Sequence, residues 1–132
     1  MSQRMSVTIA LLLGVLAVAN GTFMILAPEP WYWLVPGVPD RGPFNQHLVR
    51  DIGINYLLIG IAFVLGCTFE RFRLALWFYP AAWLLGHGIF HIWEVLVGLC
   101  SPVFLAIDFL GVTLPALLSV YLTYVSYTLH RL

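Results

Sequence analysis

The sequence is poor in charge and contains no lysine. Only 9% of its 132 residues are charged, whereas soluble globular proteins carry about 25%. These few ionic groups cannot cover a water-soluble fold, and 61% of the residues are hydrophobic. With no basic cluster, the chain is also expected to have no nucleic-acid partner and no polybasic lipid-binding patch. Lipid is therefore its expected solvent, and the bilayer its expected partner.

Cysteine is scarce as well. Cys67 and Cys100 are the only two, and they form no redox motif. The helices expected below place them on opposite sides of a membrane, whereas a disulfide requires Cα atoms within about 7 Å. An intramolecular disulfide is therefore excluded.

What the chain does contain is four apolar stretches, and each is long enough to cross a bilayer. A hydrocarbon core about 30 Å thick takes about 20 helical residues. The stretches are apolar on all faces and rich in Leu, Ala and Val, which favours helices over the alternating strands of a β-barrel. We expect an all-α, integral membrane four-helix bundle, a single domain over residues 1–132, with helices at about 5–27, 45–69, 74–98 and 103–129.

The arginines predict the orientation of this bundle in a bacterial inner membrane. Positive residues favour the cytoplasmic side. The bias places both termini in the cytoplasm and the Pro-rich connection, residues 28–44, in the periplasm, with Trp31, Tyr32 and Trp33 as interfacial anchors. The arginines expected inside are Arg4, Arg71, Arg73 and Arg131, and those outside are Arg41 and Arg50.

The first apolar stretch has a competing interpretation. Arg4, the apolar run 7–18 and the triplet at 17–19 resemble a signal peptide cleaved after residue 19. Against cleavage, the apolar run continues to Ala27 and reaches the length of a full span. A cleaved chain would keep the other three helices in the same orientation.

Polar residues inside the expected helices carry the functional information, because each costs roughly 2.5–3.5 kcal/mol to insert. His87, His91 and Glu94 cover an arc of only about 60° on the third helix. Counting inward from the outer boundary places four polar residues at a common depth of roughly 8–10 Å. These four are Asn20, Asp51, His91 and Asp108, while His47, Asp51 and Asn55 follow each other at four-residue spacing on the second helix, beside Arg50.

Imidazoles and carboxylates together indicate a site for a divalent transition metal, namely zinc, iron, manganese or copper. With neutral histidines, the three acids and Arg50 leave two negative charges, which such an ion would cancel. If the protein is an enzyme, Glu94 is the expected proton acceptor, and Arg50 would orient a carboxylate or bind an anion. The expected metal ligands are His47, Asp51, His87, His91, Glu94 and Asp108, with Arg50, Asn55 and Asn20 in support.

Two other interpretations stay open. The polar residues could form a purely structural network, with Arg50 bridging the carboxylates, in an accessory subunit of a membrane complex or a homo-oligomer. They could also line a proton or ion pathway, which would need hydration past His87 to the cytoplasm.

Glycine and proline indicate how the helices pack. Gly53, Gly60, Gly66, Gly86, Gly88 and Gly111 are expected to allow close helix approach. Gly86 and Gly88 flank His87 and could leave room beside it. Pro80 and Pro115 are expected to kink the third and fourth helices.

Two runs resemble a known group of proteins: GPFNQHLVRDIG over residues 42–53 and GHGIFH over residues 86–91. They are similar to uncharacterised small bacterial inner-membrane proteins, loosely like the DoxX group of four-helix proteins. The resemblance implies a four-helix fold over the whole chain. It also implies a link to membrane redox chemistry without assigning roles to these residues, so the activity stays open.

Overall fold

The structure is a computed structural model that describes residues 3–129. All its regular elements in this range are helices, as expected. Arg131, which contributes to the expected orientation, lies outside the described residues. The long helices are α1 (Gln3–Leu26), α3 (Gln46–Thr68), α4 (Arg73–Leu96) and α6 (Leu114–Leu129), and the short ones are α2 (Pro28–Leu34), η1 (Pro39–Arg41), η2 (Glu70–Phe72), α5 (Phe104–Ile107) and the π-helix η3 (Phe109–Thr113).

Within residues 3–129, three segments are long and apolar enough to cross a membrane. They are Gln3–Leu26, Gln46–Thr68 and Phe109–Leu129. Helix α4 has the same length as α1, 24 residues, but it is not among the three. It carries two histidines and a glutamate as well as Arg73, which reduce its hydropathy. The fourth span therefore stays a prediction.

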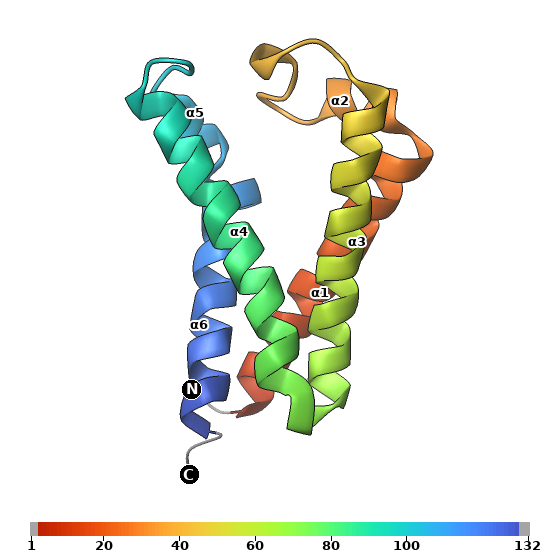
Figure 1. The fold of residues 1–132 in the computed structure, drawn as a ribbon, viewed down its shortest axis with the longest axis vertical. Helices are drawn as coiled ribbons and strands as arrows, with labels where there is room; N and C mark the ends of the chain where they lie inside the picture. The colour runs from red at the N-terminus through yellow and green to blue at the C-terminus, as the bar shows by residue number, and fades with distance from the viewer. Residues whose placement is uncertain (1–2, 130–132) are drawn as a thin grey trace.

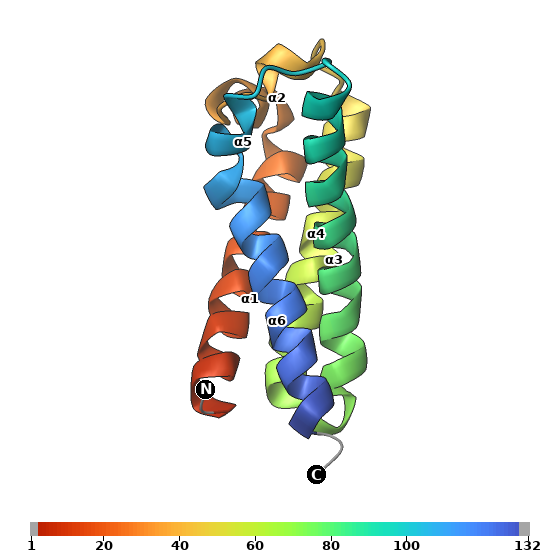
Figure 2. The same ribbon diagram turned by 90° about the vertical axis from the view of Figure 1, so that its left-hand side faces the viewer.

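The long helices form two pairs, α1 with α3 and α4 with α6 (Figure 1). Helix α1 begins and α6 ends at the same end of the molecule, where η2 also lies (Figures 1 and 2). We call this the terminal end, and we call the opposite end, with α2, η1 and α5, the loop end. The pairs meet near the terminal end and diverge toward the loop end, where the segment 28–44 arches between them (Figure 1).

Glycines allow the close contact between α1 and α3. A Cβ atom at Gly21 would lie 2.5 Å from the carbonyl oxygen of Gly53, and one at Gly60 would lie 2.6 Å from that of Gly14. Small residues at the interface bring the two backbones together without lipid between them. The expected close approach is confirmed for Gly53 and Gly60, and for Gly66, whose missing Cβ leaves room for the Trp77 ring.

The other three glycines do not mark tight contacts, and the expectation is wrong for them. A Cβ at Gly86 or Gly111 would meet no atom within 4 Å, and one at Gly88 would find its nearest neighbour, Ala116, at 3.7 Å. Gly86 and Gly111 lie where the helices border open space, whereas Gly88 is buried and has room for a Cβ in ordinary contact. The sequence pattern does not distinguish glycines at tight helix contacts from glycines without such contacts.

The terminal end is densely packed around a buried arginine. Phe63 and Trp77 are almost completely buried there. Arg73 is only 7% exposed and donates from Nε to the carbonyl oxygen of Gly66 at 2.9 Å. It also pairs with Glu70 at 3.1 Å and lies over the Trp77 ring. Because the last carbonyls of a helix lack internal partners, Arg73 caps the end of α3.

The fourth apolar stretch is not one continuous helix, contrary to expectation. Its chain forms α5, turns at Asp108 and then forms the π-helix η3 before α6 begins. Proline has no N–H, and its ring crowds the carbonyl four residues earlier, so Pro115 disfavours regular α-helix just before it. Instead, the amides of Val112 and Thr113 both donate to the carbonyl oxygen of Asp108, at 2.7 and 3.2 Å. The turn points the Asp108 side chain into the bundle, where it is 7% exposed.

Candidate ligand cavity

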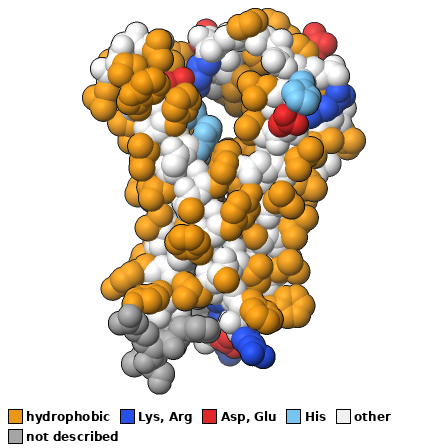
Figure 3. Space-filling view, viewed as in Figure 1, with side chains coloured by type: hydrophobic (Ala, Val, Ile, Leu, Met, Phe, Trp, Pro, Cys, Tyr) orange, Lys and Arg blue, Asp and Glu red, His pale blue; other side chains and the backbone are white. Residues whose placement is uncertain are grey.

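A cavity of about 580 Å³ lies between the two helix pairs in the half of the molecule toward the loop end. Figure 3 shows the hollow between the pairs, with histidine and arginine colours at its edge. Helices α1, α3, α4 and η3 supply its walls, and the segment after α2 closes one side. Its polar lining residues include Asn20, Arg41, His87, His91 and Asp108, and its apolar ones include Leu13, Leu16, Ile59, Phe63, Leu84 and Val112.

Asp108 is the centre of the polar end of this cavity. Its Oδ2 accepts a hydrogen bond from Arg41 Nη2 at 2.6 Å and lies 2.8 Å from His91 Nδ1. Its Oδ1 has no hydrogen bond from any described residue. A buried carboxylate is costly unless it is paired, and these two partners come from a loop and from another helix. Asp108 therefore ties three separate segments together.

Arg41, at the end of η1, bridges the two helix pairs. Besides Asp108, it contacts the carbonyl oxygen of Gly37 at 3.3 Å, and its guanidinium lies over the Phe104 ring at 4.7 Å. Its Nε is 3.7 Å from Glu94 Oε2, and both atoms are buried with no hydrogen-bond partner among the described residues. Glu94, the expected proton acceptor, thus contacts Arg41 and is not among the residues that line the cavity.

Sequence reasoning gave this bridging role to Arg50, and the structure corrects that assignment. Arg50 Nε donates to the carbonyl oxygen of Ile25 at 3.1 Å, so it caps the end of α1. Arg41 was missed because it lies in a connection with Pro and Gly on both sides, where a surface position is the usual expectation. The signal that could have found it is its place on the same side of the membrane as the acids.

His87 and His91 face the cavity together, as the 60° arc predicted. Their rings lie 4.4 Å apart, edge to face, and Trp83 stacks on the other side of His87 at 4.9 Å. Because the Nδ1 of His91 meets Asp108, a neutral His91 donates there and presents Nε2 as an acceptor. The carboxylate thus fixes the orientation of the imidazole.

His47 and Asp51 do not join this group. They pair with each other at 3.1 Å, and their side chains are 88% and 54% exposed. Gly53 packs on α1, and at 3.6 residues per turn Asp51 points about 160° away from it and His47 about 120°. The expected depth of Asp51 allowed it to meet His91 and Asp108, but the rotation of α3 turns Asp51 and His47 away from them.

The structure therefore does not assemble the expected six-ligand site. Within residues 3–129, no group of three or more His, Cys, Asp and Glu is placed to hold a metal ion. Asp108 and Glu94 gather around Arg41, His91 pairs with Asp108, and His87 lies against His91. Two imidazoles remain the best placed candidates for a metal.

The two supporting asparagines both accept hydrogen bonds, but in different parts of the molecule. Asn20 Oδ1 accepts from Trp31 Nε1 at 2.9 Å, and both residues line the cavity. Trp31 thus points inward, whereas Trp33 is 65% exposed and suits the expected interfacial anchor. Asn55 Oδ1 accepts from the Tyr79 hydroxyl, which links α3 to α4.

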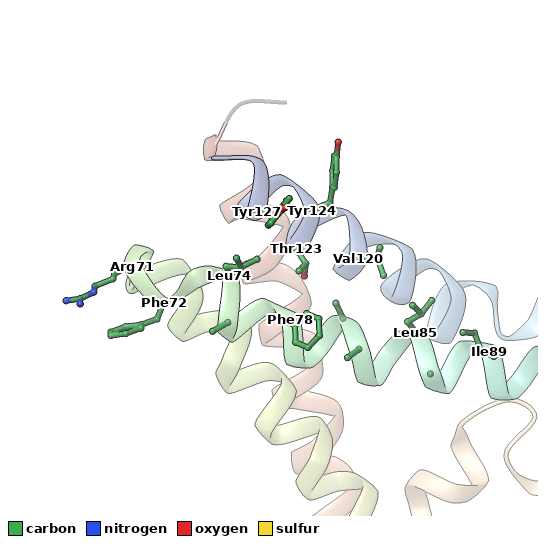
Figure 4. A pocket seen from close by; sticks show the side chains of 14 residues that line it. Arg71, Phe72, Leu74, Phe78, Leu85, Ile89, Val120, Thr123, Tyr124 and Tyr127 are labelled. Carbon is green, nitrogen blue, oxygen red and sulfur yellow. The ribbon is translucent and has the colours of Figure 1, made fainter. Parts of the chain in front are cut away.

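A second hollow is a shallow groove of about 1130 Å³ along α4 and α6 (Figure 4). Phe78, Leu85 and Ile89 of α4 and Val120 of α6 line it, with Tyr124 at one side. No histidine or carboxylate among the described residues lines it. It also contains Gly86, which explains the open space there. The lining of the groove is mainly apolar, and its polar members are Arg71, Thr123, Tyr124 and Tyr127.

The cavity at the loop end thus combines apolar walls with one fixed polar end, which is the usual construction of a small-molecule site. Comparisons of the chain with protein-family models, with curated proteins and with solved structures gave no match, so its interpretation comes from this geometry.

Proposed function

We propose that this chain is a small multi-pass membrane protein that binds a lipid-soluble small molecule in the cavity at the loop end. The observation that carries the proposal is an apolar space of about 580 Å³ with a buried polar cluster at one end. Most of the lining is hydrophobic, which suits the body of such a molecule. The few polar groups are held by one another and fix its orientation.

A matched pair of variants on α1 tests this proposal. Ala17 lines the cavity, whereas Ala19, two residues on, is exposed on the outer face of the helix. Ala17→Phe fills cavity space, and Ala19→Phe adds the same ring outside it. Small molecules retained by each purified protein are extracted and quantified by mass spectrometry, with a detergent blank. We expect the wild type and Ala19→Phe to retain a molecule that Ala17→Phe loses; equal retention by all three, or none by the wild type, would refute the proposal.

A metal at His87 and His91 is the second candidate, supported by the proximity of the two rings and by the carboxylate that orients His91. A third protein ligand would require side chains to move, since no three His, Cys, Asp or Glu residues within residues 3–129 are placed to hold a metal ion. Glu94 could then accept a proton in a metal-dependent reaction. Elemental analysis of the wild type beside His87→Ala/His91→Ala tests it: stoichiometric zinc, iron, manganese or copper that the double variant loses would support it, and a metal-free wild type after growth with these ions would refute it.

The proposed location is a bacterial inner membrane with the terminal end in the cytoplasm. The arginine bias supports this orientation. The native cysteines test it, since Cys67 lies at the terminal end of α3 and Cys100 lies at the loop end, both partly exposed. A membrane-impermeant thiol reagent should label Cys100 on intact spheroplasts and Cys67 only after permeabilisation. Labelling of Cys67 first, with Cys100→Ser as control, would reverse the orientation.

A further inference from the structure

The polar end of the cavity is built to receive a positive charge. We propose that its ligand is a lipophilic cation, a molecule with a positive group on an apolar body. This inference rests on the proposed function and names the class of ligand that the same site selects. The charge of the site, its hydrogen-bonding groups and the aromatic rings of its walls support it.

The charges around Arg41 do not balance. The two carboxylates of Asp108 and Glu94 face a single guanidinium, so with neutral imidazoles the group carries one excess negative charge. Apolar walls surround it, and an uncompensated charge is costly in such surroundings. A cation in the cavity would offset this charge, and an anion would add to it.

The hydrogen-bonding groups at the polar end are mainly acceptors. Both donors to Asp108 use Oδ2, which leaves Oδ1 without a hydrogen bond from the described residues. Neutral His91 donates through Nδ1 and offers Nε2 as a second acceptor. Both residues line the cavity. These acceptors would attract the positive group of a ligand, and the carboxylate would repel an anion.

Arg41 is poorly placed to attract an anion instead. Its Nη2 donates to Asp108 and its Nη1 to Gly37, and its face covers the Phe104 ring. Its Nε faces Glu94. Two carboxylates therefore already lie beside this guanidinium, and they would repel a carboxylate or phosphate that approached it.

Aromatic side chains in the cavity wall also favour a positively charged ligand. Trp31 and Tyr56 both line the cavity, and the bond from Trp31 to Asn20 fixes the indole. The face of an aromatic ring attracts a cation, most strongly when water is excluded. The same rings provide apolar contact for the body of the ligand.

Two probes of the same shape and opposite charge test the inference. Tetraphenylphosphonium and tetraphenylborate are each equilibrated by dialysis with the purified wild type, and detergent alone serves as the blank. We expect saturable binding of the phosphonium at one site per chain and no borate binding above the blank. Ala17→Phe should abolish the phosphonium binding, whereas Ala19→Phe should retain it.

Charge variants then locate the site. Asp108→Asn should weaken phosphonium binding at least tenfold, whereas Asp51→Asn, which removes the same charge from an exposed position outside the cavity, should leave it unchanged. Arg41→Gln removes the opposing cation and should strengthen binding about tenfold. A folding defect would not produce that gain, so the test stays decisive even if Asp108→Asn is unstable.

The outcomes separate this inference from the proposed function. Borate binding as tight as phosphonium binding, or unchanged phosphonium binding in both Asp108→Asn and Arg41→Gln, would overturn the cation inference. Binding that Ala17→Phe blocks would still support a ligand cavity in those cases. If neither probe binds while the wild type retains a molecule that Ala17→Phe loses, the cation inference alone fails. If the wild type retains no molecule and binds no probe, both proposals fail.

Discussion

Arg73 and Arg41 are both largely buried, one at each end of the bundle, and their polar partners come from different parts of the fold. Arg73 bonds to carbonyls of the helix just before it and packs on Trp77 in a dense core. Arg41 reaches from a loop on one helix pair to the acids of the other pair, beside a cavity. The comparison shows how helix divergence creates a site. Where the helix pairs meet, Arg73 donates to backbone carbonyls close to it in sequence. Where the pairs separate, Arg41 pairs with acids on the opposite helix pair.

The packing of the first pair gives the largest expected effect. A Cβ at Gly60 would lie 2.6 Å from Gly14 O and 2.7 Å from Val18 N, both backbone atoms that cannot rotate away. Gly60→Ala should therefore destabilise the protein by about 3 kcal/mol, the upper range for overpacking. Gly86→Ala is the matched control, since its Cβ would meet no atom within 4 Å. Unfolding midpoints in mixed micelles measure both, and equal effects would contradict the close approach of α1 and α3.

The Arg73 cap gives the next largest effect. Arg73→Gln removes the donors to the carbonyls of Gly66 and Cys67. Leaving buried carbonyls without partners should cost about 2 kcal/mol, measured by the same unfolding assay. The neighbouring exposed Arg71→Gln should change stability little. If Arg73→Gln were as mild as Arg71→Gln, the terminal end would not depend on this cap.

Arg50 caps a helix at the loop end, and its removal is expected to have a smaller effect on stability. Its single bond to the carbonyl oxygen of Ile25 should contribute about 1 kcal/mol. Arg50→Gln should also leave the binding of tetraphenylphosphonium unchanged, because Arg50 is not among the residues that line the cavity. A strong loss of probe binding would return Arg50 to the site role that the sequence suggested.

Apolar length predicted the helices and their approximate ends, and depth predicted that His91 and Asp108 could meet. The other site residues depended on the rotation of α3 about its axis and on the path of the segment 28–44, which carries Arg41. Depth fixes the level of a residue and packing fixes its direction, so Asp51 reached the expected level on the wrong face. Gly53 and Gly60, seven residues apart, could have indicated that face in advance. Pro115 indicated a break in the fourth helix but not its form, a π-helix after the turn at Asp108. The inward direction of Arg41 arises from tertiary contacts that no local pattern encodes.

The most direct test of the account is the coupling between Arg41 and Asp108, since their contact connects the two pairs and forms the polar end of the cavity. Unfolding free energies of the wild type, Arg41→Gln, Asp108→Asn and the double variant give that coupling. We expect about 1–3 kcal/mol, as for partners in one buried network. Additive effects, within about 0.3 kcal/mol, would show that the two residues do not interact and would contradict the site described here.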